Sequence, residues 1–417
     1  MTKQGYKATA DVMSFALTGP TGVDACPVSI RCTVDTAEPS GFYIEAKPSL
    51  HVEGVSPVQA KEIAVRVRSA LTATSLCAWP TGRVTITVDA GGAKLQAPAL
   101  DLPIALAIAG IDVQGLLVAG ELGLDGSVRP VRGVFQAARM AAVRGMRGVL
   151  VPEANMHDAL DASDGDVFAI ATLWNLSAAL ATSVRGSWKR EPRRLTHTPD
   201  FTDVRGQETV IASVVTSVRA RAGLMLSGPP GTGKTMIARR IPSVLPALTH
   251  EQYADVTSVY SAVGLSDGLM YYRPFRAPHH TISVAALVGG GSAPRPGEVQ
   301  LATHGVLFLD ELPEFSRAAI DALADALNRM SAASRPLVVA AANPCPCGWR
   351  GSTVRACLCS DSAISRYTSR VAWAATRLGI TVTAQTHPVP LNALRGVVGE
   401  SSESIRARLA AVDKEGI

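Results

Sequence analysis

The sequence predicts an α/β protein in which helices cover both faces of a parallel sheet. Short apolar runs that suit buried parallel strands occur at residues 222–227, 305–311 and 336–342. A glycine-rich segment at residues 228–235 joins the first run to a helical pattern. Upstream, residues 11–182 alternate strand-like and helix-like segments, which favours a second unit of mixed α and β structure.

The N-terminal part contains three clear local patterns. Residues 83–88 alternate β-branched side chains and therefore predict a strand. Residues 57–73 place apolar side chains such as Ile63 and Val67 at helical spacing, which predicts an amphipathic helix. Residues 101–109 predict another helix, after a glycine-rich turn.

The length of 417 residues favours two or three domains. We expect an N-terminal domain at residues 1–182, a basic linker at 183–200, a second α/β domain at 201–389 and a short helical segment at 390–417. The linker is polar and rich in arginine, so it is either solvated chain between domains or a basic segment that contacts DNA.

Composition and charge indicate where in the cell the protein is expected and which partners it can contact. The net charge of +5 permits contact with nucleic acid without indicating it. No apolar run reaches the roughly 18–20 residues that a membrane span needs, and the first residues lack the pattern of a signal peptide. We therefore expect a cytoplasmic protein without membrane contact.

Residues 228–235 have the pattern G-x-x-x-x-G-K-T of a phosphate-binding loop (P-loop). Glycines in such a loop let successive backbone N–H groups turn towards one anion, and the following helix adds positive potential. Lys234 is expected to reach the β- and γ-phosphates, and the Thr235 hydroxyl can bind Mg²⁺. The expected cofactors are therefore ATP and Mg²⁺.

Polar residues end the second and third apolar runs. Asp310 is expected at the Mg²⁺ beside Thr235, and Glu311 can polarise the attacking water as a general base. Asn343 is placed to orient that water against the γ-phosphate. The expected ATP-binding residues are Gly228, Pro229, Pro230, Gly231, Thr232, Gly233, Lys234, Thr235 and Asp310.

Four of the seven cysteines lie within fifteen residues: Cys345, Cys347, Cys357 and Cys359. In a reducing compartment such a cluster indicates a metal site before it indicates disulfides. Four thiolates could enclose a structural Zn²⁺. The alternative is a set of free thiols in a loop beside the nucleotide site. His279 and His280, by contrast, are neighbours expected to point in different directions, so a shared metal is not expected there.

Longer strings of the sequence resemble the ComM family, a group of magnesium-chelatase-like AAA+ ATPases associated with competence. Besides the P-loop, the resemblance runs through DFTDVRGQ (200–207), RPFRAPHHT (273–281), HGVLFLDELPEF (304–315) and NPCPCG (343–348). It implies an ATP-hydrolysing homo-oligomeric ring, a hexamer, that acts on DNA as a helicase or branch-migration motor in competence and recombination.

The resemblance extends to the N-terminal part, where residues 118–133 and 148–155 are similar to the family's Lon-protease-like domain. A Lon-type peptidase needs a serine nucleophile and a lysine that accepts its proton. The segment at 96–103 has no hydroxyl, and the lysine position falls near Ala137. We therefore expect a Lon-like domain without the catalytic dyad, and no peptidase activity.

The sequence departs from the family in its C-terminal half. Residues 316–342 leave no room for the family's pore-facing β-hairpin. Arg377 matches the arginine that completes the neighbouring subunit's site, but its flanking aspartates are absent, and Arg366 and Arg370 are alternatives. The segment at 390–417 is shorter than the family's lid, so we expect the lid to be largely missing.

Two other functions remain open. A regulatory or remnant protein that binds ATP without hydrolysing it would keep Lys234, Thr235 and Asp310. A magnesium-chelatase-type motor would share the ATPase domain, although the Lon-like N-terminal part disfavours it.

Overall fold

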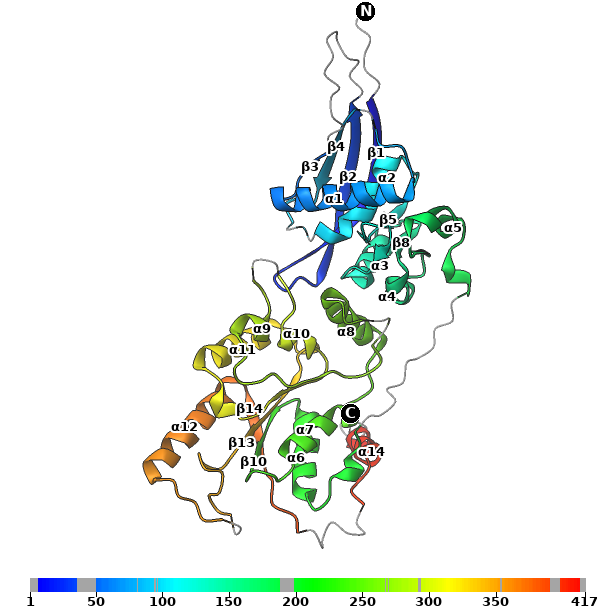
Figure 1. Cartoon of the computed structure of the whole chain (residues 1–417). Helices are drawn as coiled ribbons and strands as arrows, with labels where there is room; N and C mark the ends of the chain where they lie inside the picture. The colour runs from blue at the N-terminus through cyan, green and yellow to red at the C-terminus, as the bar shows by residue number, and fades with distance from the viewer. Residues whose placement is uncertain are drawn as a thin grey trace, which may run out of the picture. The chain divides into compact units, whose positions relative to one another are not determined.

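The computed structural model describes residues 7–35, 50–80, 82–93, 95, 97–187, 199–266, 268, 270–291, 294–352, 355–390 and 398–412. Two compact units make up the chain (Figure 1). The first unit comprises Met1–Glu191, Thr257–Met270 and Ser292–Arg295, and the second comprises Pro192–Val256, Tyr271–Gly291 and Pro296–Ile417. Helix α8 (His250–Val263) crosses the division between them at Thr257.

A seven-stranded mixed sheet forms the centre of the first unit. Its strands, in spatial order, are β3 (Leu50–Glu53), β4 (Arg83–Asp89), β2 (Asp24–Asp35), β1 (Lys7–Thr18), β5 (Leu116–Val118), β8 (Gly148–Pro152) and β9 (Asp166–Ile170). β2 is antiparallel to both β1 and β4, and the other pairs are parallel. A separate two-stranded ribbon joins β6 (Glu121–Leu122) to β7 (Val128–Arg129).

Helices pack on both faces of this sheet. They are α1 (Pro57–Thr74), α2 (Asp101–Ala109), α3 (Val134–Val143), α4 (Met156–Ala162) and α5 (Leu176–Ala181). Because successive strand residues face opposite sides, Leu116 and Val118 join the core with α1 and α2, whereas Leu117 joins the core with α3 and α4. The predicted strand at 83–88 and the helices at 57–73 and 101–109 are confirmed.

The second unit contains a five-stranded sheet in which every pair is parallel. The spatial order is β11 (Phe275–Arg276), β12 (Val306–Leu309), β13 (Leu337–Ala342), β10 (Gly223–Ser227) and β14 (Ile380–Gln385). All carboxyl ends therefore lie at one edge of the sheet and all amino ends at the other. β10, which precedes the P-loop, lies between β13 and β14.

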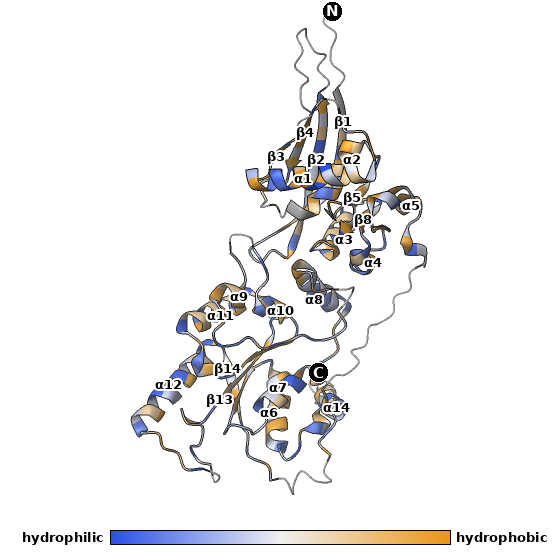
Figure 2. Ribbon diagram, in the orientation of Figure 1, coloured by the Kyte–Doolittle hydropathy of each residue, from blue (hydrophilic) through white to orange (hydrophobic). Residues whose placement is uncertain are grey.

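Helices cover both faces of the parallel sheet (Figure 1). α6 (Glu208–Ala220), α7 (Lys234–Arg240) and α14 (Ser402–Val412) share one core with Leu224 and Leu226 of β10. α9 (Val284–Val288), α10 (Glu298–Leu301), α11 (Arg317–Arg329) and α12 (Asp361–Arg377) belong to the opposite side, whose core includes Met225. In Figure 2 most helices carry both hydrophobic and hydrophilic residues along their length, as expected for helices with one buried side.

The predicted fold class, a mixed α/β chain with a parallel sheet, is confirmed. Between Phe315 and Asn343, where all residues are described, the chain forms helix α11 and a short turn before β13, without a β-hairpin. Residues 188–198 of the expected linker, and 391–397 and 413–417 of the expected C-terminal segment, lie outside the described residues. Among the described helices, none combines the length and the apolar character needed to cross a bilayer.

Candidate functional site

The P-loop leaves the carboxyl end of β10 and ends where α7 begins at Lys234. Gly231 and Gly233 have φ angles of +78° and +86°, in the left-handed region that glycine adopts without strain. A Cβ on Gly228 would overlap the Thr386 hydroxyl. These three glycines are therefore required by backbone conformation and by close packing.

Lys234 lies across the loop that precedes it. Its Nζ donates hydrogen bonds to the carbonyl oxygens of Gly228 (2.6 Å) and Pro229 (2.9 Å) and to Oδ1 of Asn343 (3.2 Å). Burial lowers the pKa of Lys234, and the nearby Asp310 carboxylate opposes that shift. The ammonium group therefore lies half-buried among three oxygen atoms.

The expected Mg²⁺ ligands meet at the same place. Thr235 Oγ1 donates to Oδ2 of Asp310 at 2.9 Å, across the gap between α7 and the end of β12. The other Asp310 oxygen accepts from the Glu311 amide at 3.0 Å. A hydroxyl and a carboxylate side by side fit the oxygen ligands that Mg²⁺ prefers.

Glu311 has an unusual backbone and an unexpected partner. Its φ angle is +52°, a conformation that costs a residue other than glycine free energy and that concentrates at functional sites. Its exposed side chain places Oε2 3.4 Å from Nδ1 of His280. The expectation that His279 and His280 point apart is wrong, since their ring centroids are 4.1 Å apart.

Lys234, Asp310, Glu311, His280 and Asn343 line one cavity of about 280 Å³. Tyr367 of α12 also lines this cavity. Its hydroxyl accepts a hydrogen bond from the backbone N–H of Asn343 at 3.2 Å. Burial raises the pKa of Tyr367, so the phenol stays protonated at neutral pH. The polar side chains that line the cavity are Lys234, His280, Asp310, Glu311, Glu314, Asn343 and Tyr367.

The structure thus brings Lys234, Asp310, Glu311 and Asn343 to one cavity. Sequence reasoning missed the contribution of His280, although the residue stands in one of the strings that carried the family resemblance. It also missed Tyr367, for which the sequence offers no signal.

Thr386 is a further residue that sequence reasoning missed. It follows β14 and is fully buried. Its Oγ1 lies 2.6 Å from that of Thr232, and its amide donates to the Ser227 carbonyl at 2.7 Å. The edge strand β14 therefore anchors the P-loop from the side opposite β13.

Arg377 lies at the end of α12 and does not line the cavity around Lys234. Its Nε is 2.7 Å from Asp321 and its Nη2 is 3.7 Å from Asp325, both on α11. Of the alternatives, Arg370 donates to the Phe315 carbonyl at 3.0 Å. A role for Arg377 in a neighbouring subunit's site stays a prediction.

The four cysteines lie in the segment between Asn343 and α12, two near its start and two near its end. Their sulfur atoms all lie within 4.8 Å of one another, so the cluster could hold a metal ion. Cys345 is buried and the other three are partly exposed. Hydrogen bonds from the amides of Trp349 and Leu358 lower the pKa of Cys347 to about 6.

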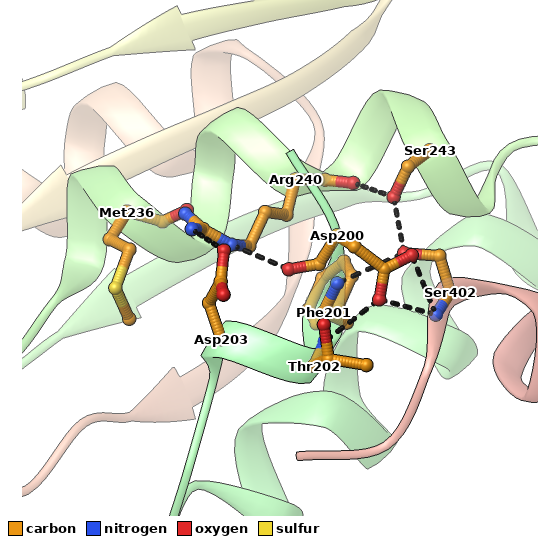
Figure 3. A network of polar contacts seen from close by, with 8 residues as sticks. All are labelled: Asp200, Phe201, Thr202, Asp203, Met236, Arg240, Ser243 and Ser402. Atoms are coloured by element: carbon orange, nitrogen blue, oxygen red, sulfur yellow. Dashed lines mark hydrogen bonds and ion pairs between the residues drawn. The ribbon is translucent and has the colours of Figure 1, made fainter. Parts of the chain in front are cut away.

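A polar network holds the far end of the P-loop helix (Figure 3). Arg240, at the end of α7, donates from Nε to the Asp200 carbonyl (2.8 Å) and pairs with the Asp203 carboxylate (2.5 Å). The Asp200 carboxylate accepts from the amides of Thr202 (2.9 Å) and Ser402 (3.2 Å). Helix α14, which begins at Ser402, is thereby joined to the helix that carries Lys234 and Thr235.

Asp200 is the acceptor at the centre of this network. Burial raises its pKa, but the hydrogen bonds from Thr202 and Ser402 more than offset that effect, so the pKa is lowered overall. The carboxylate is therefore ionised at neutral pH and stabilises the folded state.

Family comparisons cover most of the chain. A family model described as magnesium chelatase, subunit ChlI, matches residues 200–389, which include every residue that lines the cavity. A second model, described as subunit ChlI of Mg-chelatase, matches residues 43–155.

Individual relatives agree with this result. An uncharacterized protein of Mycobacterium tuberculosis is 35% identical over 388 residues, which is 87% of this chain and 76% of the relative. The Escherichia coli protein YifB is 31% identical over 417 residues, with 94% and 79% covered. The competence protein ComM of Haemophilus influenzae is 35% identical over 357 residues, with 78% and 68% covered. The chain belongs to the ComM family of magnesium-chelatase-like proteins.

Membership of the ComM family makes this chain an AAA+ ATPase-like protein. The roles of the P-loop, Asp310 and Asn343 stay predictions. The Lon-like interpretation of the first unit stays a prediction, because the matching model carries only the chelatase description.

The network of Figure 3 generates a prediction about stability. Asp200→Ala removes the acceptor of two amides, so we expect it to lower the free energy of unfolding by about 1–2 kcal/mol. Urea denaturation measures this loss. Asp203→Ala is the comparison variant, because the Asp203 side chain is 56% exposed and Arg240, which is 13% exposed, keeps its hydrogen bond to the Asp200 carbonyl, so we expect a smaller loss. Equal losses in the two variants would contradict this role of Asp200.

Proposed function

We propose that this ComM-family protein is an ATP-driven motor that acts on DNA as a homo-oligomeric ring, a hexamer, with a role in competence and recombination. The observation that carries the ATPase part is the convergence of Lys234, Thr235, Asp310, Glu311 and Asn343 at one edge of the parallel sheet. Ligands of open parallel sheets bind at this edge.

Each residue has a distinct task in the proposed reaction. Lys234 exchanges its carbonyl partners for phosphate oxygens, and Thr235 and Asp310 hold Mg²⁺. When bound, Mg²⁺ neutralises charge on the β- and γ-phosphates. Glu311 takes the proton of the attacking water, while Asn343, fixed by Lys234 and Tyr367, orients that water.

The placement of Arg377 supports a ring. Arg377 lies outside its own site, as an arginine that acts on a neighbouring subunit must, and Asp321 and Asp325 hold it from α11. The relative from Haemophilus influenzae carries the name competence protein. The name of this relative supports the proposed role in competence.

Two alternatives have a specific observation in their favour. A non-hydrolysing ATP-binding regulator is favoured by the contact of Glu311 with His280, which occupies one oxygen of the proposed base. A chelatase-type motor is favoured by the description of the two family models.

Glu311→Gln provides the test of turnover. The amide cannot accept the water's proton, so we expect ATP turnover to fall by about 10²–10⁴-fold while Mg-ATP still binds. The measurement is steady-state phosphate release with no DNA, with single-stranded DNA and with forked DNA, and DNA should stimulate the parent protein. A parent protein that binds ATP but shows no turnover in any condition would favour the regulator.

His280→Ala tests the neighbour of Glu311. We expect the imidazole to orient the carboxylate, so that its removal lowers kcat by about tenfold, or 1.4 kcal/mol, and leaves the KM for ATP within about twofold. His280→Asn, which keeps a donor at this position, should recover part of the lost kcat. A rise in turnover on removal would instead show that His280 restrains Glu311.

We also propose that the four cysteines bind one structural Zn²⁺. A tetrahedral site with Zn–S bonds of about 2.3 Å has S–S edges of about 3.8 Å. The Sγ atom of Cys345 is 3.4 Å from that of Cys347, and both lie 3.6 Å from that of Cys357. These separations support a thiolate cage.

Metal analysis of the purified protein tests the zinc site. We expect one Zn²⁺ per chain, and its loss in Cys357→Ser. Cys77→Ser, outside the cluster, is the matched control and should retain the metal. A parent protein that contains no zinc ends this proposal.

A further inference from the structure

A second cavity, of about 380 Å³, lies at the amino-terminal edge of the parallel sheet. Its walls include Arg273 just before β11, Gly305 just before β12, Pro336 just before β13 and Arg221 just before β10. The strands are parallel, so this is the edge opposite the one that carries the P-loop. The cavity volume lies within the range of about 300–1,000 Å³ typical of ligand sites.

Three arginines line this cavity, and no aspartate or glutamate is among the described residues that form its walls. Arg273 is half-buried and donates from Nε to the Pro246 carbonyl at 2.6 Å and from Nη1 to the His304 carbonyl. Burial, together with the charge of Arg221, lowers the pKa of Arg273 to about 10. This guanidinium therefore lies out of full solvent with carbonyl partners and no carboxylate among the contacts described for it.

The other two arginines are exposed. Arg221 directly follows α6 as its C-cap and has a φ angle of +48°. Arg335 follows the turn after α11. Among the described residues neither side chain forms an ion pair. Both also line an adjoining cavity of about 300 Å³ that includes Arg377. The two cavities share Arg221, Arg335, Pro336 and Leu337 in their walls. We call the surface around Arg221, Arg273 and Arg335 the arginine groove, and we leave out Arg377 because it is paired with Asp321 and Asp325.

His304 contributes a buried polar group to the same wall. It is 5% exposed and has a φ angle of +58°. Its Nε2 lies 3.0 Å from the Asp255 carboxylate, whereas its Nδ1 is buried without a hydrogen-bond partner among the described residues. Asp255 is thus engaged with His304, and the groove keeps an excess of donors over acceptors.

We propose that the arginine groove binds the phosphate groups of a nucleic acid strand. Guanidinium groups suit phosphate because their N–H donors match its oxygens in pairs. The groove runs from β11 to β14 past several strand ends, which suits a chain of phosphates better than a single anion. This assignment rests on the proposed action on DNA and gives it a location. A free polyphosphate is the other possible source of the same chemistry.

The test compares a double variant, Arg221→Ala with Arg335→Ala, with the parent protein and with Arg139→Ala. Arg139 is an exposed arginine of α3 in the first unit, so this variant shows the effect of removing one arginine charge outside the groove. Fluorescence anisotropy without ATP measures binding of a labelled single-stranded oligonucleotide at several salt concentrations. Retained Mg-ATP binding shows that the double variant is folded, since the P-loop lies at the opposite edge.

We expect the double variant to bind the oligonucleotide at least about tenfold more weakly than the parent, and Arg139→Ala to bind within about twofold of it. Each lost phosphate contact lowers the slope of log K against log salt by about 0.7 for a single strand, so the slope should fall by about 1.4. Parent-like affinity and slope in the double variant would overturn the proposal. A parent protein that binds no DNA overturns the proposed action on DNA, and the location with it.

A second arm identifies the source of the phosphate. In a Lys234→Ala background, which removes the P-loop lysine, pyrophosphate binding is measured by calorimetry with and without the two arginine changes. Binding of pyrophosphate that needs the arginines, with oligonucleotide binding unchanged, would overturn the nucleic acid as ligand and assign the groove to a free anion. Pyrophosphate that fails to bind, while the oligonucleotide needs the arginines, supports the proposal as stated.

Discussion

Two hydrogen bonds hold the site together: Lys234 to Asn343, and Thr235 to Asp310. Each links the first turn of α7 to the carboxyl end of a different strand. They can form only because β10, β13 and β12 are parallel neighbours, so that residues 109 and 75 positions apart in the sequence meet at one edge. The strand register therefore fixes the separation of the phosphate-binding, metal-binding and water-orienting groups.

Residues around the site connect the P-loop and α7 to β14 and α14, and connect Asn343 to the cysteine cluster. Thr386 connects the P-loop to the edge strand β14, and Arg240 connects the far end of α7 to Asp200 and through it to α14. On the other side, the loop after Asn343 leads directly into the cysteine cluster. A displacement of α7 on nucleotide binding would therefore also displace α14. A metal bound by the cysteine cluster would restrict the motion of the loop that holds Asn343.

The sequence predicted the parts of this site that depend on local pattern. The P-loop, Asp310 and Asn343 could be placed because apolar runs mark buried strands and polar residues mark their ends. His280, Tyr367 and Thr386 could not, because each reaches the site through tertiary packing that leaves no periodic trace. β11 has only two residues, too few for a pattern. The aspartates missing beside Arg377 in the sequence have counterparts on α11, one helical turn apart.

The two edges of one sheet thus carry different chemistry: the P-loop, acidic pair and Asn343 lie at the carboxyl ends, and Arg221, Arg273 and Arg335, which form no ion pair among the described residues, lie at the amino ends. The account depends most on the first edge. Calorimetric titration with Mg-ATP tests it most directly, on the parent protein and on Lys234→Ala. We predict one site per chain and a loss of affinity of at least about tenfold, or 1.4 kcal/mol, in the variant. Equal affinity in both proteins would contradict the assignment of this cavity as the nucleotide site.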